Sequence, residues 1–306
     1  MRGVTLAQLR AFTVVAKHLS FGKAADELCV TPPAVSMQIK ELELSLEVCL
    51  FRREGSRVSL TTPGESLLFY VRRVFATLAD AASTLAGIKG VVHGALTIGV
   101  VPTGSYFVPR FLARFLADHP CAEPRVIVGG RSKVIDMLGE QAIDLAVMAR
   151  APDDASIDSV PFAPLLNVLV ASREHPLASR ARIPVGELAN CRFIVREEGS
   201  ETRDALERYL VMLALSPSRL TEMGSNEAVK QAVIANLGVG FLPWEAVRLE
   251  YEKQLVSVLP VCGPRVIDRW HLAHHRNHGL SPVAEAFRYA LMEEGERFVR
   301  CGWPVQ

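Results

Sequence analysis

Cysteine is scarce in this sequence, and charge of neither sign dominates it. The six cysteines stand far apart along 306 residues and none forms a CxxC pair. This excludes a dense disulfide framework and the closely spaced ligand pairs of a zinc finger, so we expect reduced thiols that pack as small hydrophobic groups. With 34 Lys and Arg against 33 Asp and Glu, the formal net charge is +1, which excludes a polyanion-coating protein.

Long hydrophobic runs are also missing. The longest stretch without a formal charge, 90–109, contains four glycines and two prolines, and it therefore cannot form a membrane helix. The first residues lack the apolar core of a signal peptide. We expect a cytoplasmic protein without a membrane-spanning helix.

The residues that are present suit two or three globular domains. Apolar residues make up 49% of the chain and charged residues 22%, which is enough apolar material for more than one core at this length. Residues 1–90 hold 11 Lys and Arg against 8 Asp and Glu, whereas the remainder holds 23 against 25. The slightly basic N-terminal part indicates an anionic partner.

Three helices are predicted near the start of the chain, because apolar residues recur at helical spacing over 5–18, 21–28 and 32–46. Ser20 and Thr31 stand at N-cap positions, and Pro32 stands at the first position of the third helix, where a missing N–H does no harm. Two short helices joined by the tight turn 29–31 form a helix-turn-helix, which presents its second helix to the major groove of DNA.

The third helix is predicted to have an inward and an outward face. The inward residues are apolar: Ala34, Val35, Ile39, Leu42 and Leu46. Short polar groups and an amide on the other face suit base edges and phosphates. The candidate DNA-contacting residues of this segment are Thr31, Pro33, Ser36, Met37, Gln38 and Lys40.

A small basic hairpin is predicted after the third helix. Arg52, Arg53 and Arg57 flank Gly55, which we expect at the turn. These arginines form a wing that suits a phosphate backbone. Each feature taken singly is also typical of a solvated helix face and a charged loop.

The order and spacing of these motifs resemble the N-terminal signature of LysR-type transcriptional regulators. The residues that carry the resemblance are Ser20-Phe21, Ala24-Ala25, Leu28, Thr31, Pro33-Ala34-Val35-Ser36, Gln38-Ile39, Leu42-Glu43, Leu50-Phe51-Arg52-Arg53 and Leu60-Thr61-Thr62-Pro63-Gly64. The chain departs from the family at Pro32, where Gln is usual, and at Glu47, where Gly is usual in the turn between helix and wing.

A long helix is predicted over 63–90, with its apolar stripe at three- and four-residue spacing. Such a helix needs a partner to bury this stripe. The resemblance implies a dimerisation helix, and the alternative is packing against the C-terminal part of the same chain. A two-fold dimer would bind a two-fold DNA site. A homotetramer, as an alternative to the homodimer, is implied by the resemblance alone.

The rest of the chain reads as α/β. Strands are predicted at 94–101, 125–128, 143–148, 167–171, 193–195 and 238–242, with helices between them and a last helix over 282–299. This alternation predicts βαβ units and a mostly parallel sheet. It resembles the two-lobed effector-binding region of LysR-type regulators, which is similar to periplasmic binding proteins. The resemblance also places the strand 269–275 in lobe one.

The predicted organisation is therefore a winged helix-turn-helix DNA-binding domain at 1–62, a linker or dimerisation helix at 63–90 and an effector-binding domain at 91–306. Lobe one comprises 91–162 and 267–306, and lobe two comprises 163–266.

Three polar turns that precede helices are candidates for binding an anion. N–H groups at a helix start, hydroxyls and arginine side chains all favour negative charge, and such turns gather where open α/β sheets bind ligands. Ordinary helix capping is the alternative for each turn. The candidate effector-binding residues are Thr103, Gly104, Ser105, Arg131, Arg196, Ser200, Thr202, Arg203, Ser225 and Asn226.

The segments 193–203 and 222–233 are similar to the LysR-type regulators of Calvin-cycle operons, and Arg269-Trp270 and Leu280-Ser281-Pro282 agree with them. Those relatives respond to phosphorylated or otherwise anionic metabolites. They commonly have Gly-Ser-Gly-Thr where this chain has Glu201 in the third place, and an extra carboxylate would weaken an anion site unless it points away.

Catalysis and metal binding find little support. Neither Gly-x-Ser-x-Gly nor HExxH occurs, and the cluster His271, His274, His275 and His278 lacks a nearby carboxylate or Cys to complete a usual metal site. We expect a regulator, not an enzyme, without a cofactor or metal. Its partners are double-stranded promoter DNA and a small anionic metabolite, with RNA polymerase as a further candidate. The competing interpretation is an enzyme or a solute-binding protein built from the same two lobes.

Overall fold

The computed structural model describes residues 3–54, 57–87, 94–264, 266–277, 279–300 and 302–303. The chain forms two compact units, residues 1–82 and 83–306, and each is considered by itself. Among the described residues, no helix has both the length and the apolar character that crossing a bilayer requires.

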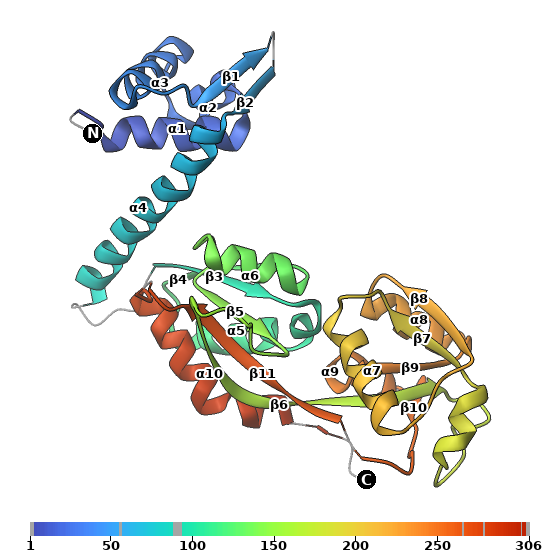
Figure 1. Cartoon of the computed structure of the whole chain (residues 1–306). Coiled ribbons are helices and arrows are strands. Elements are labelled where there is room, and N and C mark those ends of the chain that lie inside the picture. The colour runs from blue at the N-terminus through green and yellow to red at the C-terminus, as the bar shows by residue number, and fades with distance from the viewer. Residues whose placement is uncertain are drawn as a thin grey trace. The chain divides into compact units, whose positions relative to one another are not determined.

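The first unit is a winged helix-turn-helix (Figure 1). Its elements are α1 (Leu6–His18), α2 (Phe21–Leu28), α3 (Pro32–Leu46), β1 (Phe51–Glu54), β2 (Arg57–Leu60) and the start of α4 (Thr62–Gly87). The predicted bounds of the first three helices are confirmed to within one residue. The Ser20 hydroxyl caps α2 by accepting from the Lys23 N–H, whereas the Thr31 side chain forms no cap hydrogen bond although its backbone has N-cap geometry.

The junction between α3 and the wing depends on two glutamates. Glu47 ends α3 in the left-handed conformation, with φ 56°, so the turn that usually takes Gly is formed here by a residue with a side chain. The Glu43 carboxylate accepts from the Leu50 N–H at 2.7 Å and from the Phe51 N–H at 3.2 Å. These two bonds fix the start of β1 against α3.

The helix α4 packs only its first turns into the core of this unit. Val71 is buried, and Leu67, Leu68 and Phe75 pack beside it. On the same helix, Val74 and Leu78 are exposed although they belong to the same predicted stripe. The side chains of 82–87 and all of 88–90 lie outside the described residues, so the last part of the stripe is not placed.

The second unit contains one nine-stranded sheet in the order β4-β3-β5-β11-β6-β9-β7-β8, with β10 paired to β6. The strands are β3 (Gly94–Val100), β4 (Ala122–Val128), β5 (Leu145–Met148), β6 (Ile157–Ser172), β7 (Arg192–Arg196), β8 (Arg219–Met223), β9 (Val239–Pro243), β10 (Val256–Val258) and β11 (Val266–His275). The prediction of a mostly parallel sheet holds at each end, but it is wrong in the middle, where β6 and β11 run antiparallel to every strand they pair with.

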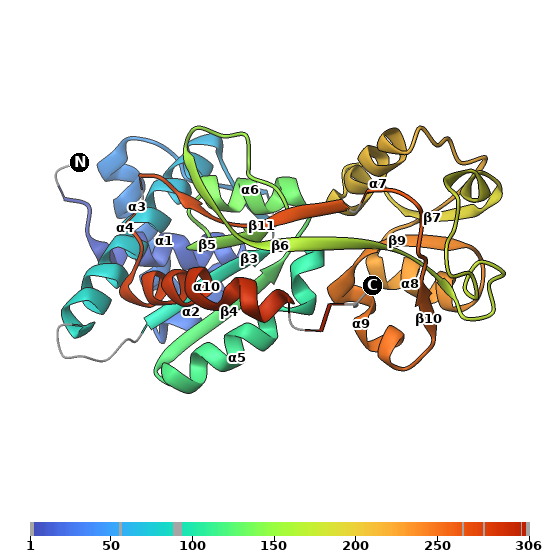
Figure 2. The same cartoon turned by 90° about the horizontal axis from the view of Figure 1, so that it is seen from below.

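Helices cover this sheet in two groups, which define two lobes (Figures 1 and 2). Lobe one is built on β3, β4 and β5 with η1 (Pro102–Tyr106), α5 (Val108–Asp118), α6 (Arg131–Gly139) and α10 (Pro282–Arg300). Lobe two is built on β7, β8 and β9 with η2 (Val185–Asn190), α7 (Glu201–Met212), α8 (Asn226–Ile234) and α9 (Trp244–Glu252). The strands β6 and β11 run through both.

The three tryptophans of the chain all lie in this unit. Trp270 is fully buried in lobe one, with its ring 4.9 Å from that of Phe107. Trp244 is buried in lobe two, and Trp303, which follows α10, packs against the same core cluster as Trp244. The segment after α10 therefore reaches from lobe one to lobe two.

Some expectations about element and side-chain placement were wrong. The first part of β6 and all of η2, β8, α9 and β10 were not predicted. Among the described cysteines, Cys29, Cys49 and Cys121 are exposed, so they do not pack as small hydrophobic groups. Their exposure follows from their places in turns and at the start of a strand, because connecting segments run over the surface.

The left-handed Glu47 generates a first prediction. A side chain in this conformation is strained by about 1 kcal/mol, and glycine is not. Glu47→Gly is expected to raise the thermal unfolding midpoint of the first unit. Lys40→Gly, at an exposed and ordinary helical position of α3, is expected to lower the midpoint, because it costs about 1 kcal/mol of helix stability. A fall for both variants would contradict the assigned strain.

A buried carboxyl at the start of α9 generates a second prediction. Burial raises the pKa of Glu245 from 4.5 to about 7, against the smaller influence of Trp303 and Arg248. The folded state then holds this proton more tightly than the unfolded chain, so stability falls as pH rises from about 4.5 to 7.

The free energy of unfolding of the wild type is expected to fall by about 3 kcal/mol between pH 5 and pH 8 because of Glu245. Glu245→Gln cannot lose this proton and should not show that fall. Urea unfolding at the two pH values measures the difference. Glu252→Gln, on the exposed end of the same helix, should keep the wild-type pH dependence. An unchanged slope in Glu245→Gln would show that Glu245 titrates normally.

Candidate functional site

The helix α3 has one buried and one open face. Val35, Ile39 and Leu42 are at most 1% exposed, whereas Met37 is 60% exposed. The predicted contact residues are exposed or half-buried: Thr31, Pro33, Ser36, Met37, Gln38 and Lys40. Of the residues predicted to face inward, Ala34 and Leu46 are only half-buried. The open face therefore carries the short polar groups that the sequence placed there.

The wing brings further positive charge to this unit. Arg52 on β1 and Arg57 on β2 are exposed. The backbone of Arg53 pairs with that of Val58 in the hairpin, and its side chain lies outside the described part. So does Gly55, the predicted turn residue.

A cavity of about 450 Å³ lies between the two lobes of the second unit. Lobe one contributes the start of η1 and the start of α6. Lobe two contributes Gly224 and the segment 196–202, which runs from the end of β7 to the start of α7. The carboxyl ends of β3, β4, β7 and β8 lead into these segments, which is where open α/β sheets bind ligands. Five predicted residues line the cavity: Thr103, Arg131, Arg196, Ser200 and Thr202.

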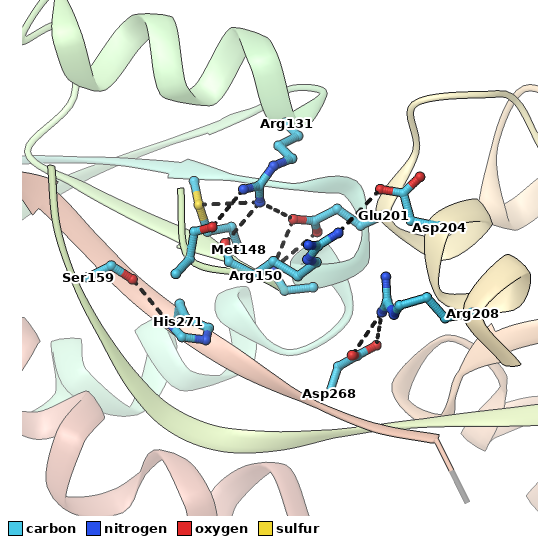
Figure 3. Close-up of polar contacts among 11 residues, drawn as sticks. Arg131, Met148, Arg150, Ser159, Glu201, Asp204, Arg208, Asp268 and His271 are labelled. Atoms are coloured by element: carbon cyan, nitrogen blue, oxygen red, sulfur yellow. Dashed lines mark hydrogen bonds and ion pairs between the residues drawn. The ribbon is translucent and has the colours of Figure 1, made fainter. Parts of the chain in front are cut away.

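Arg131 lines the cavity and already has a carboxylate partner (Figure 3). Its Nη1 donates to the Arg150 carbonyl at 2.9 Å and to Glu201 Oε1 at 3.1 Å, and its Nη2 donates to the Ala151 carbonyl at 2.8 Å. The Ala149 N–H lies 3.2 Å from both Glu201 oxygens. Glu201 thus points into lobe one, and burial raises the pKa of its carboxyl against the opposing influence of Ala149 and Arg131.

Arg196 is engaged in the same way on the lobe-two side. It is 5% exposed, and its Nε and Nη2 donate to the two Glu197 oxygens at 2.7 and 2.5 Å. Its Nη1 donates to Asn226 Oδ1 at 2.7 Å. The hydrogen bonds from Arg196 hold the pKa of Glu197 below its usual value. Of the three arginines expected to grip an anion, Arg131 and Arg196 line the cavity, and both are paired with carboxylates.

Unpaired polar groups remain at the cavity. The hydroxyl oxygens of Thr103 and Thr202 are buried and have no hydrogen-bond partner among the described residues, and the same holds for Asn226 Nδ2. Lys133, on the first turn of α6, is exposed at the cavity and forms no ion pair with another described residue. Sequence reasoning missed Lys133, although Gly129-Gly130 before a helix was a signal for a ligand-facing turn.

Four predicted residues lie away from the cavity wall, and Asn226 reaches it only through Arg196. Gly104 is buried, and a Cβ there would lie 2.6 Å from the Val100 side chain. Ser105 follows it in η1. Arg203 Nε donates to Glu207, one turn further along α7, at 2.6 Å. The Ser225 hydroxyl accepts from the Ala228 N–H, so it serves as a helix cap.

Two further contacts join the lobes (Figure 3). Arg208 Nη2 on α7 lies 2.9 Å from both carboxylate oxygens of Asp268 on β11. Arg150 Nη1 and Asp204 Oδ2 are 3.8 Å apart. The lobes therefore meet through several charged pairs.

The histidine cluster does not form a metal site in the described residues, which contain no group of three or more His, Cys, Asp or Glu able to hold a metal. His271 Nδ1 lies 3.1 Å from the Ser159 hydroxyl. His278 lies outside the described part of the chain.

Two family models match the chain. "Bacterial regulatory helix-turn-helix protein, lysR family" matches residues 6–65, and "LysR substrate binding domain" matches residues 89–296. The chain belongs to the LysR family of bacterial transcriptional regulators. The resemblance drawn from the sequence is thereby confirmed.

Two similar proteins indicate the subgroup of the LysR family to which the chain belongs. The HTH-type transcriptional regulator CfxR of Cupriavidus necator is 39% identical over 299 residues, which cover 98% of this chain and 94% of the relative. The RuBisCO operon transcriptional regulator of Allochromatium vinosum is 37% identical over 294 residues, covering 96% and 97%. This LysR-type regulator thus falls in the Calvin-cycle regulator subgroup and is not an enzyme, which sets aside the enzymatic interpretation.

A solved relative contains a ligand. The regulatory domain of CcmR from Synechocystis PCC6803, in complex with 2-PG, is 29% identical, and the match covers 65% of this chain and 96% of that chain with a TM-score of 0.61. The fold of the second unit is therefore that of a LysR-type regulatory domain.

Proposed function

We propose that this LysR-type regulator binds two-fold promoter DNA through α3 and the wing, assembles as a homodimer or homotetramer through α4, and changes its DNA binding when a small anionic metabolite occupies the inter-lobe cavity. The domain limits in this proposal are 1–62, 63–90 and 91–306. The observation that carries it is the division of α3 into a sealed apolar face and an open polar face.

The DNA-binding role is supported by the chemistry of that open face. Hydroxyl and amide groups, as in Ser36 and Gln38, form hydrogen bonds with base edges, and lysine and arginine bind phosphates without reading sequence. Arg52 and Arg57 place such charge on the adjacent hairpin. A promoter-bound regulator would act in the cytoplasm and beside RNA polymerase.

The assembly role is supported by the exposed apolar residues of α4. Tyr70, Val74 and Leu78 are 60%, 42% and 45% exposed. An apolar stripe of this kind on a long helix is stabilised by a second copy.

The effector role is supported by the unpaired groups at the cavity. Lys133 supplies a cation, and the starts of α6 and α7 supply N–H groups with a positive helix dipole. Thr103 and Thr202 supply hydroxyls that have no hydrogen-bond partner in the described part of the chain. The CcmR regulatory domain, solved with 2-PG, supports a small-molecule effector for the related domain of this chain.

A third prediction tests the DNA surface. Gln38→Ala is expected to reduce the preference for the selected site by about 1–3 kcal/mol, because a base-edge contact is lost. Arg57→Ala is expected to weaken binding to all sequences and to reduce the salt slope by about 1, because one phosphate contact is lost. Selection from random duplexes, followed by mobility-shift titrations at several salt concentrations, measures both.

The control for Arg57→Ala is Arg219→Ala, which removes the same charge from an exposed position of the second unit and should leave the salt slope unchanged. If Arg57→Ala and Arg219→Ala behaved alike, the wing would not contact DNA. If Gln38→Ala kept full discrimination, α3 would not read bases through this residue.

A fourth prediction tests the cavity. Thr202→Val keeps the side-chain shape and removes a hydroxyl that no other described residue bonds, so protein stability should not fall. Affinity for the effector is expected to fall about tenfold, the usual effect of one lost hydrogen bond. Lys133→Ala is expected to reduce affinity for anionic compounds and not for neutral analogues.

The measurement is a thermal-shift screen of phosphorylated and carboxylated metabolites with uncharged analogues, on the full chain. Thr221→Val, whose hydroxyl accepts from Arg192 on the outer strands of lobe two, is the matched control and should bind as wild type. If no anion shifts the wild-type protein, or if only neutral compounds do, the anionic-effector proposal fails.

A further inference from the structure

Glu201 belongs to lobe two, but both groups that hold its carboxylate belong to lobe one (Figure 3). It is the first residue of α7, and its side chain is 6% exposed. The Ala149 N–H lies 3.2 Å from each of its oxygens, and Arg131 Nη1 lies 3.1 Å from one of them. This contact therefore ties the two lobes together at the wall of the cavity.

The donors in lobe one form a carboxylate-binding site that does not depend on Glu201. Arg131 is held in place by the carbonyls of Arg150 and Ala151, and Ala149 directly follows the buried strand β5. A guanidinium N–H and a backbone N–H that converge on two oxygens are the donors that a small carboxylate needs. The adjoining cavity of about 450 Å³ gives such a molecule a route to them.

We propose that Glu201 is a built-in ligand: its side chain occupies a carboxylate subsite of lobe one and keeps the lobes joined with no metabolite bound. A free carboxylate of acetate size is the ligand that this subsite would take if the side chain were removed. The inference rests on the proposed function only in treating the adjoining cavity as the effector site.

This assignment also explains how the cavity balances its charge. Its wall contains Arg131, Lys133 and Arg196 together with Glu197, Glu198 and Glu201. Arg131 is paired with Glu201 and Arg196 with Glu197, which leaves the cation Lys133 and the carboxylate Glu198 on the wall. Of these two, only Lys133 can attract an incoming anion. An effector would therefore bind beside Glu201, at Lys133, and not in its place.

The test is chemical rescue of Glu201→Ala in the full chain. Alanine removes the terminal carbons and oxygens of the side chain, and acetate supplies an equivalent group. The variant is expected to unfold about 5–10 °C below wild type, since one partner of a buried ion pair is left alone. Sodium acetate should restore much of this loss, because a ligand that binds only the folded state stabilises it.

Three controls define the rescue. Acetamide at the same concentration and sodium chloride at the same ionic strength should not restore stability. Wild type should show no saturable response to acetate. Glu201→Ala combined with Arg131→Met should also not respond, because the guanidinium is gone. Asp204→Ala, on the same helix and 3.8 Å from its arginine, should lose little stability and gain no acetate dependence.

A Glu201→Ala variant that is as stable as wild type, or that acetate and acetamide stabilise equally, would overturn the inference. If this variant does not fold, small-angle X-ray scattering on Glu201→Gln decides. A larger radius of gyration than wild type supports the built-in ligand, and an unchanged radius overturns it. The metabolite screen on wild type is separate, so a failed effector proposal and a failed rescue are distinguishable.

Discussion

The pairing of β6 with β11 is the constraint on which the effector-binding domain depends. These two strands pair antiparallel from Asn167 and Val266 to Ile157 and His275, and both lobes are attached to them. Along β6, Leu165 packs in the lobe-one core and the next residue, Leu166, packs in the lobe-two core. The two cores therefore meet at the middle of this pair of strands. Besides this pair of strands, the lobes are connected by the contacts that Glu201 and Asp204 of lobe two make with Arg131 and Arg150 of lobe one.

The DNA-binding unit could be predicted from the sequence almost completely, because its signals are local. Helical periodicity, the Ser20 cap and Pro32 fix the bounds of the three helices to within one residue. Glu47 shows the limit of such reasoning. The turn requires a left-handed residue, and the structure places a glutamate there, supported by the Glu43 carboxylate that holds the start of the wing.

The effector-binding domain was harder to predict, because its pairings are distant in sequence. The helix α9 follows β9 at Pro243 without a loop, so no turn signal marks it. The edge strand β8 carries Arg219 and Glu222 and is mostly exposed, which hides its alternation. At the site, polar turns before helices located the cavity, but they did not show that Arg131 and Arg196 are already paired. Arg131 and its partner Glu201 lie far apart in sequence and become neighbours only after the sheet has formed. Arg196 and Glu197 are adjacent in sequence, and that adjacency alone did not show that their side chains pair.

The placement of the tryptophans has an optical consequence. Trp244, Trp270 and Trp303 are the three indoles of the chain, and all belong to the second unit, with one in the core of lobe one and two in that of lobe two. The first 82 residues contain none. Tryptophan fluorescence therefore reports on the two lobes and not on the winged helix. Ligand binding to the second unit of the intact chain can be followed in this way without an added dye.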